Sequence, residues 1–253
     1  LAVWEVVAAA RAGHDVPGDD EWDQAAAAVR AQYQPGDLIL FAPDWVDPVG
    51  RLHLGDLIPV DVAGRMDDAR FGRIWELSIR GARGGETAGL EPVYRESFGG
   101  VTVRRFERAP AEVVTDFVTA ADRAERPVAR PDLQEVGFAP HRCLAASPGQ
   151  GKTAVMRWPS IELGSQLVGY FGEADVFTRR ENLYPARLEV LVAGHPAADL
   201  TVGPDDGWVR FAAPTPPGAA EVVFRATDLT PGDHKRKEGE RTHILCFAAE
   251  ARR

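Results

Sequence analysis

The sequence predicts an α/β plus all-β protein, in which a Rossmann-like open sheet is followed by a β-sandwich or jelly roll. Three observations support this prediction. The chain of 253 residues is longer than a typical single domain. Helix-like and strand-like segments alternate up to about residue 110. Beyond residue 138 only short apolar segments remain, separated by Gly, Pro, Asp and Asn. We therefore expect one domain over residues 1–110 and a second over residues 111–253.

The first helix is expected to begin at Asp19, where acidic residues precede an alanine-rich run that extends to Tyr33. Acidic side chains favour a helix N-terminus, and Pro35-Gly36 then ends the helix. The apolar run 38–41 follows, which indicates a strand buried on both faces.

Further elements extend this pattern along the first half. We expect a second helix over 62–71, a strand over 74–79, and a hairpin formed by 93–98 and 101–106 around Gly99-Gly100. Together these elements predict an open sheet with a mixed edge.

In the second half, residues 113–118 fit either a helix or a strand, and Pro127 with Pro131 marks a break. Even spacing of short apolar segments is typical of a sandwich. The predicted strands are 153–158, 166–171, 187–192, 208–212, 221–226 and 244–249.

Cys143 and Cys246 each lie in a short apolar run that resembles a strand, near the two ends of the second half. The first and last strands of sandwiches often pair, so a disulfide fits this placement and would suit an exported protein. Two buried free thiols fit the sequence equally well.

The formal charge of −9 argues against a nucleic-acid partner, because phosphate binding requires a concentrated cationic surface. The basic run Lys235–Lys237 is followed closely by Glu238 and Glu240, which is typical of a solvated loop.

No segment approaches the roughly 20 apolar residues of a membrane-spanning helix, since the apolar stretch 1–10 is interrupted by Glu5. The sequence begins at Leu1 rather than methionine, which leaves room for an upstream signal peptide or membrane anchor.

Residues 146–153 match the permissive pattern of a phosphate-binding loop and end in Gly151-Lys152-Thr153. A working loop needs a long helix after it, but residues 153–158 alternate and Pro159 follows. We expect a glycine-rich turn between strands and no bound nucleotide. The six histidines are dispersed and no Gly-x-Ser-x-Gly motif occurs, so no metal or cofactor is predicted.

The loop 43–56 is the candidate site of the first half, because it follows the carboxyl end of a predicted central strand. Asp44, Asp47 and His53 are candidates for acid–base chemistry, and Arg51 and Asp56 for substrate binding.

A structural interpretation of the same loop stands beside this one. Asp47 would cap a short helix that has Pro48 at its first position, Trp45 would pack in the core, and Arg51 would pair with an acid.

Residues 25–108 resemble the soluble region that follows the membrane helices of bacterial dolichyl-phosphate-mannose-type glycosyltransferases. The features that match are Gln34-Pro35-Gly36-Asp37, the strand 38–41, Arg73-Ile74-Trp75, Phe98-Gly99-Gly100-Val101 and Arg105-Phe106-Glu107. The catalytic acids of that family lie between membrane helices that this chain lacks. The resemblance therefore implies an extracytoplasmic location rather than an activity.

The second half also resembles carbohydrate-binding jelly-roll modules in its pattern of strands. Sugar rings stack on aromatic side chains and accept hydrogen bonds from planar polar groups. Arg179, Arg180 and Asn182 are the candidates for ligand contact in an exposed turn. The candidate aromatic residues are Trp158, Tyr170, Tyr184 and Trp208.

Two hypotheses follow. In the first, the chain is a non-catalytic extracytoplasmic accessory protein whose sandwich binds a glycan or a protein partner, with aromatic residues exposed on the sandwich. In the second, it is an enzyme that acts on a glycosyl or phosphorylated substrate through the loop from Asp44 to Asp56.

Overall fold

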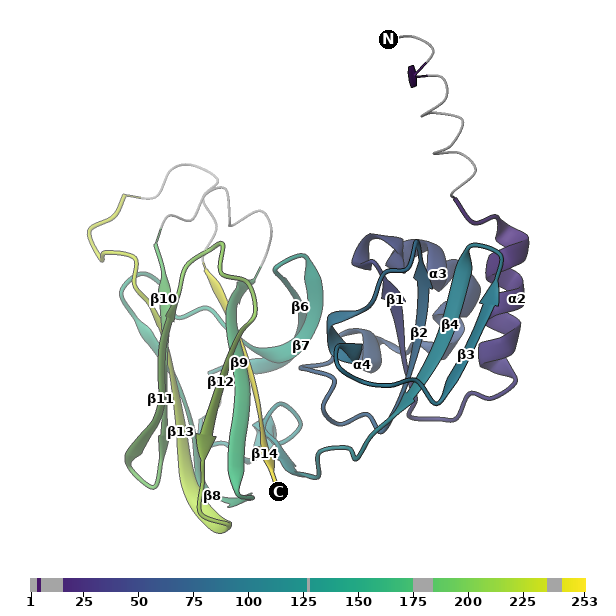
Figure 1. Cartoon of the computed structure of the whole chain (residues 1–253). Helices are drawn as coiled ribbons and strands as arrows, with labels where there is room; N and C mark the ends of the chain where they lie inside the picture. Colours follow the sequence, from purple (N-terminus) through teal and green to yellow (C-terminus); the bar gives the residue numbers. More distant parts are fainter. Residues whose placement is uncertain (1–3, 6–15, 127, 175–183, 236–242) are drawn as a thin grey trace. The chain divides into compact units, whose positions relative to one another are not determined.

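The computed structural model describes residues 4–5, 16–126, 128–174, 184–235 and 243–253 (Figure 1). The chain forms two compact units. The α/β unit comprises Leu1–Val62 and Asp68–Pro110, and the sandwich comprises Ala63–Asp67 and Ala111–Arg253. None of the helices formed by the described residues has the length and hydrophobicity needed to cross a membrane.

The first half of the chain contains a small mixed sheet of four strands in the order β1-β2-β4-β3. Only β1 and β2 run parallel, whereas β2–β4 and β3–β4 are antiparallel. The open, mixed sheet agrees with the sequence, but a single parallel pair falls short of a Rossmann-like sheet. The elements are α2 (Asp19–Arg30), β1 (Leu38–Ala42), η1 (Asp44–Val46), α3 (Asp47–Leu54), η2 (Gly55–Leu57), α4 (Val60–Ala63), β2 (Arg73–Ile79), η3 (Gly85–Thr87), β3 (Tyr94–Phe98) and β4 (Val101–Glu107).

Helices α2 and α3 pack on the face of the sheet that carries Phe41. Trp22 of α2 makes an edge-to-face contact with Phe41, with ring centroids 6.4 Å apart. On α3 the residue facing this ring is Gly50, where an added Cβ would lie 2.0 Å from a Phe41 ring carbon. The absence of a side chain at Gly50 therefore lets α3 approach the sheet closely.

The helix expected over 62–71 does not form. Only α4 is helical here, and it ends at Ala63. Residues 64–67 instead belong to the sandwich, while Phe71 is buried in the α/β core with Leu38 and Ile74. Contacts with both units thus override the local helical pattern.

Glu76 is a fully buried carboxylate at the centre of β2. One of its oxygens accepts hydrogen bonds from the Gly84 N–H, at 2.8 Å, and from the Thr87 hydroxyl. The other oxygen pairs with Arg104 at 2.9 Å and with Arg83 at 3.3 Å. The network satisfies both oxygens and ties the loop after β2 to the sheet.

We expect Glu76→Gln to destabilise the α/β unit by about 3–5 kcal/mol, because it leaves the buried Arg104 guanidinium without a carboxylate. Urea unfolding of the full chain measures this loss. Glu107→Gln, which removes a half-exposed partner of Arg105, is the control and should cost less than about 1 kcal/mol. A similar small loss for Glu76→Gln would contradict the prediction.

The sandwich consists of two antiparallel sheets (Figure 1). One has the order β11-β10-β13-β8, and the other has the order β12-β9-β14-β7-β6, with β5 paired to β14. The strands are β5 (Val113–Asp116), β6 (Arg130–Val136), β7 (Ala139–Ala146), β8 (Thr153–Leu163), β9 (Gln166–Ala174), β10 (Ala186–Val192), β11 (His195–Val202), β12 (Val209–Pro214), β13 (Gly218–Asp228) and β14 (Ile244–Arg252).

All six strands predicted for the sandwich are present, and the ambiguous segment 113–118 begins with strand β5. Between the sheets, Trp158 packs edge-on against Phe117 and Phe224, and Phe224 stacks on Phe247. The Trp158 indole N–H donates to the Ala120 carbonyl at 2.8 Å, so this buried ring has no unsatisfied polar atom.

Cys143 of β7 and Cys246 of β14 form a disulfide, with Cα atoms 5.6 Å apart. The two strands are neighbours, since Cys246 lies opposite Ala145. The disulfide alternative is therefore correct, and the free-thiol alternative is wrong.

We expect the double change Cys143→Ser with Cys246→Ser to lower the free energy of unfolding of the sandwich by about 2–5 kcal/mol, because the bond closes a long loop in the unfolded chain. The two cysteines are 103 residues apart. Urea titration of the oxidised protein and of the variant gives the difference. Equal midpoints would contradict the prediction.

Candidate functional site

The glycine-rich motif 146–153 connects β7 of one sheet to β8 of the other. Gly149 and Gly151 have φ angles of 88° and 63°, which lets the chain turn between the sheets. Thr153 begins a strand of 11 residues rather than a helix. The predicted turn is present, although it links two sheets and is not a hairpin.

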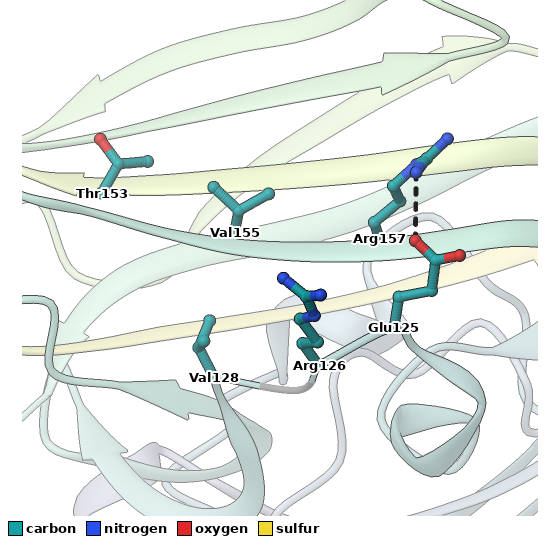
Figure 2. A pocket seen from close by; sticks show the side chains of 6 residues that line it. All are labelled: Glu125, Arg126, Val128, Thr153, Val155 and Arg157. Carbon is teal, nitrogen blue, oxygen red and sulfur yellow. Dashed lines mark hydrogen bonds and ion pairs between the residues drawn. The ribbon is translucent and has the colours of Figure 1, made fainter.

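An open groove of about 860 Å³ runs along β8 (Figure 2). Figure 2 shows its lining side chains in two rows, which meet where Glu125 contacts Arg157. Thr153, Val155 and Arg157 come from β8, and their alternation with buried residues follows the pleat of the strand. The opposite row consists of Glu125, Arg126 and Val128.

The backbone of β8 also faces this groove. The Glu125 N–H donates to the Arg157 carbonyl at 2.7 Å, on the side of β8 away from β13. Successive residues of an antiparallel strand alternate the direction of their N–H and C=O groups. Thr153 and Val155 therefore direct their backbone polar groups to the same side as Arg157. The segment that carries the opposite row turns away from the edge of β8 at Arg126, where the φ angle is +48°.

Positive charge exceeds negative charge around the groove. Arg157 donates to Glu125 at 3.1 Å and to Glu221 at 2.7 Å, and these bonds raise the pKa of its guanidinium. Within the described part of the chain, no carboxylate pairs with Arg126, with Lys152 beside Thr153, or with Arg225 opposite Val155. Of these three cations, Arg126 lines the groove, whereas Lys152 and Arg225 are neighbours of lining residues.

The candidate residues of the α/β unit are distributed among separate ion pairs. Asp47 pairs with Arg51 on α3. The structural interpretation of the loop predicted that Arg51 would pair with an acid, and this prediction is confirmed. Asp56 accepts two hydrogen bonds from Arg30, which lower the pKa of its carboxyl.

His53 lies 2.8 Å from Asp23 and stacks on Trp22, with ring centroids 6.0 Å apart. Asp44 is exposed in η1. Within the described part of this loop, Asp47 and Arg51 are the only candidate side chains that pair with each other. An enzymatic role for the loop stays a prediction.

Two expectations for this loop are wrong. Trp45 is 62% exposed rather than buried, and Arg80 lies over its ring at 5.9 Å. Asp47 is the first residue of α3 and not its cap, because Val46 occupies the N-cap position without a side-chain hydrogen bond.

Arg179, Arg180 and Asn182 lie outside the described residues, as do residues 236–242 with most of the basic run. The four candidate aromatic rings are not exposed on the sandwich, which differs from the expectation for a glycan-binding surface. Trp158 is in the core and Tyr184 contacts His234, while Trp208 stacks on Tyr170.

Trp208 stands in the middle of a stack of three half-buried rings. Its centroid lies 4.5 Å from that of His141 and 5.7 Å from that of Tyr170, with interplanar angles of 14° and 12°. His141 Nδ1 lies 3.2 Å from the Arg65 carbonyl oxygen, which fits a neutral ring that donates from Nδ1. Burial lowers the pKa of His141. The hydrogen bond with the Arg65 carbonyl opposes this shift, and the positive charge of Arg65 adds to it.

No protein-family model matches the chain. No curated protein matches it either. Several solved structures are similar to the chain. Three of them are much longer than the part that matches, because the chain covers 25%, 20% and 40% of their lengths.

One of these contains the M60 catalytic domain with CBM51-1 and CBM51-2 of ZmpB from Clostridium perfringens, at 11% identity over 66% of this chain and 20% of that chain, with a TM-score of 0.37. The CBM51 of a Clostridium perfringens GH95 protein, in complex with methyl-galactose, is 9% identical over 65% of this chain and 97% of that chain, with a TM-score of 0.32.

A family 35 carbohydrate-binding module from Clostridium thermocellum is 12% identical over 55% of this chain and 98% of that chain, with a TM-score of 0.32. At these identities and TM-scores the similarity carries no argument about function. The functional argument therefore rests on the groove and its charges.

We expect acidification to destabilise the sandwich through His141. Its pKa in the folded state lies below 6.5, so the unfolded state binds the proton more readily. The stabilisation is present above pH 6.5 and is lost progressively as the pH falls from 6.5 towards the folded pKa. Urea unfolding between pH 7.5 and 5.5 measures this slope. His141→Asn, which keeps a donor near the position of Nδ1, should flatten it, and an unchanged slope would contradict the assignment.

Proposed function

We propose that the chain is a non-catalytic binding protein and that its sandwich holds an acidic glycan in the groove along β8. The observation that carries this proposal is an open groove of about 860 Å³ whose lining includes Arg126, with Lys152 and Arg225 next to lining residues. None of these three cations pairs with a carboxylate among the described residues. A groove open along its length suits an extended chain rather than a small enclosed ligand.

The groove offers the groups that sugar hydroxyls need. A hydroxyl both donates and accepts hydrogen bonds. Arg126 supplies donors, Glu125 supplies acceptor oxygens, and the Thr153 hydroxyl, 2.9 Å from that of Thr227, can do either. Val155 and Val128, which are 41% and 57% exposed, provide apolar surface for the C–H face of a sugar ring.

The excess of positive charge favours a glycan that carries carboxylate, sulfate or phosphate groups. Guanidinium groups bind such oxyanions through two parallel hydrogen bonds, which neutral sugars cannot match. The net charge of the whole chain is −9, so the local charge of the groove contrasts with the rest of the protein.

An acidic peptide that adds a strand to β8 is the alternative occupant. Strand addition depends on a row of backbone hydrogen bonds along a free edge. Here the row is short, because Glu125 already occupies the edge at Arg157 and only Thr153 and Val155 continue it. The geometry therefore favours the glycan.

The groove has too few carboxylates among its described lining residues for glycoside hydrolysis, which favours binding without catalysis. Glycoside hydrolysis ordinarily requires two carboxylic residues on either side of the scissile bond. Among the described lining residues, Glu125 is the single carboxylate, and it is held by Arg157. An extracytoplasmic location forms part of the proposal, supported by the disulfide between Cys143 and Cys246.

Calorimetric titration of the full chain with neutral, uronate-containing and sulfated oligosaccharides tests the proposal. We expect the anionic ligands to bind and their affinity to fall with added salt. Arg126→Gln combined with Arg225→Gln should weaken binding about tenfold, which corresponds to roughly 1.4 kcal/mol. Arg187→Gln is the matched control, because Arg187 lies on the same sheet but is paired with Asp199.

Three outcomes would contradict the proposal. Equal binding of neutral and anionic glycans, with no effect of the double change, would remove the role of charge. Binding of a polyglutamate peptide without binding of any glycan would identify a protein partner. No binding of either ligand would remove the groove as a site.

A further inference from the structure

Residues 63–67 include the end of α4 and the first part of the connection to β2, yet they belong to the sandwich. We call Gly64–Asp67 the docked segment. It lies against the face of the six-stranded sheet that carries Tyr170 and Arg252, whose sequence neighbours Phe171 and Ala251 point into the core. This outer face is on the sheet that does not contain β8, so the inference below is independent of the proposed glycan site.

The sandwich binds three successive backbone carbonyls of the docked segment. The Arg142 N–H donates to the Gly64 oxygen at 2.6 Å, and His141 Nδ1 lies 3.2 Å from the Arg65 oxygen. The Trp208 indole N–H donates to the Met66 oxygen at 3.2 Å. The sandwich therefore supplies a partner for each of three successive carbonyls, although the segment contains a turn at Gly64 and a bend at Met66.

The side chain of Asp67 forms the fourth contact. It pairs at 2.7 Å with Arg252, whose side chain is only 7% exposed. Glu250 holds the same guanidinium at 2.7 Å, and the Tyr170 hydroxyl lies 3.5 Å from the second Asp67 oxygen. A buried guanidinium is costly when its partners are lost, so Arg252 makes a carboxylate at this position favourable.

Met66 supplies the apolar contact. Its side chain packs against the core cluster of the sandwich. A thioether chain adapts to an irregular surface and makes favourable contacts with aromatic rings. The outer face thus recognises carbonyl groups, one methionine and the carboxylate that follows it.

We propose that this outer face is a peptide-recognition site for a short segment in which methionine precedes aspartate, and that an external segment of the same chemistry competes with the docked segment for it. In the competing interpretation, the docked segment is a permanent part of the sandwich that no external peptide displaces. The two differ in whether the docked segment leaves the face while the sandwich stays folded.

The two methionines of the chain provide the measurement. Met66 belongs to the docked segment, whereas Met156 is fully buried in the core of the same sandwich. Oxidation by dilute peroxide, followed by mass spectrometry, reports local release at Met66 and unfolding at Met156. We expect Asp67→Asn to increase the oxidation rate of Met66 at least threefold and to leave Met156 unchanged. Asp199→Asn, which removes an aspartate–arginine pair from the other sheet, is the matched control and should change neither rate.

A peptide added to the unaltered protein decides the question even if Asp67→Asn unfolds the sandwich. The peptide has the sequence of residues 62–69, with norleucine in place of methionine so that it does not consume the peroxide. A tethered segment acts at a concentration of roughly millimolar, so peptide at several millimolar should at least double the oxidation rate of Met66. A scrambled peptide should have no effect. No acceleration by the matched peptide, or an equal rise at Met156, would overturn the proposal.

Discussion

Strand β14 is buried along almost its whole length, so each of its backbone N–H and C=O groups needs a partner within the protein. Strand β9 pairs along one side of it, while β7 and β5 pair with its two ends on the other side. The same strand supplies Cys246 to the disulfide, Phe247 to the core and Arg252 to the docked segment. The covalent link, the packing between the sheets and the recognition of Asp67 therefore all depend on the position of β14.

Sequence analysis found the strands whose apolar residues follow a pattern that is visible within the strand itself. In β8 every second residue is buried, which is the alternation that a half-exposed strand requires. Strand β6 escaped prediction because Pro131 resembles a break, and β11, which contains Pro196, was not among the predicted strands. Both strands lie at the edge of a sheet, where a missing N–H need not disturb a ladder. The glycosyltransferase resemblance stays a prediction, as does any catalytic role for Asp44.

The candidate sites depend on contacts between distant parts of the sequence, which periodicity does not reveal. The helix expected over 62–71 is displaced by contacts with His141, Trp208 and Arg252, which are 76, 142 and 185 residues from their partners in the docked segment. The alternation in β8 could identify one wall of the groove. The opposite wall could not be predicted, because the bridge from Glu125 to Arg157 spans 32 residues and no motif marks it.

The central place of β14 also has a consequence for biosynthesis. Strands β9 and β7 can be joined only after the ribosome has made residues 244–252, so the six-stranded sheet closes late. Until then both strands present unpaired backbone edges, which can associate with other nascent chains. A chain truncated before residue 244 would not fold into a smaller sandwich. It would lose the strand that joins the two halves of the sheet and would be prone to aggregate.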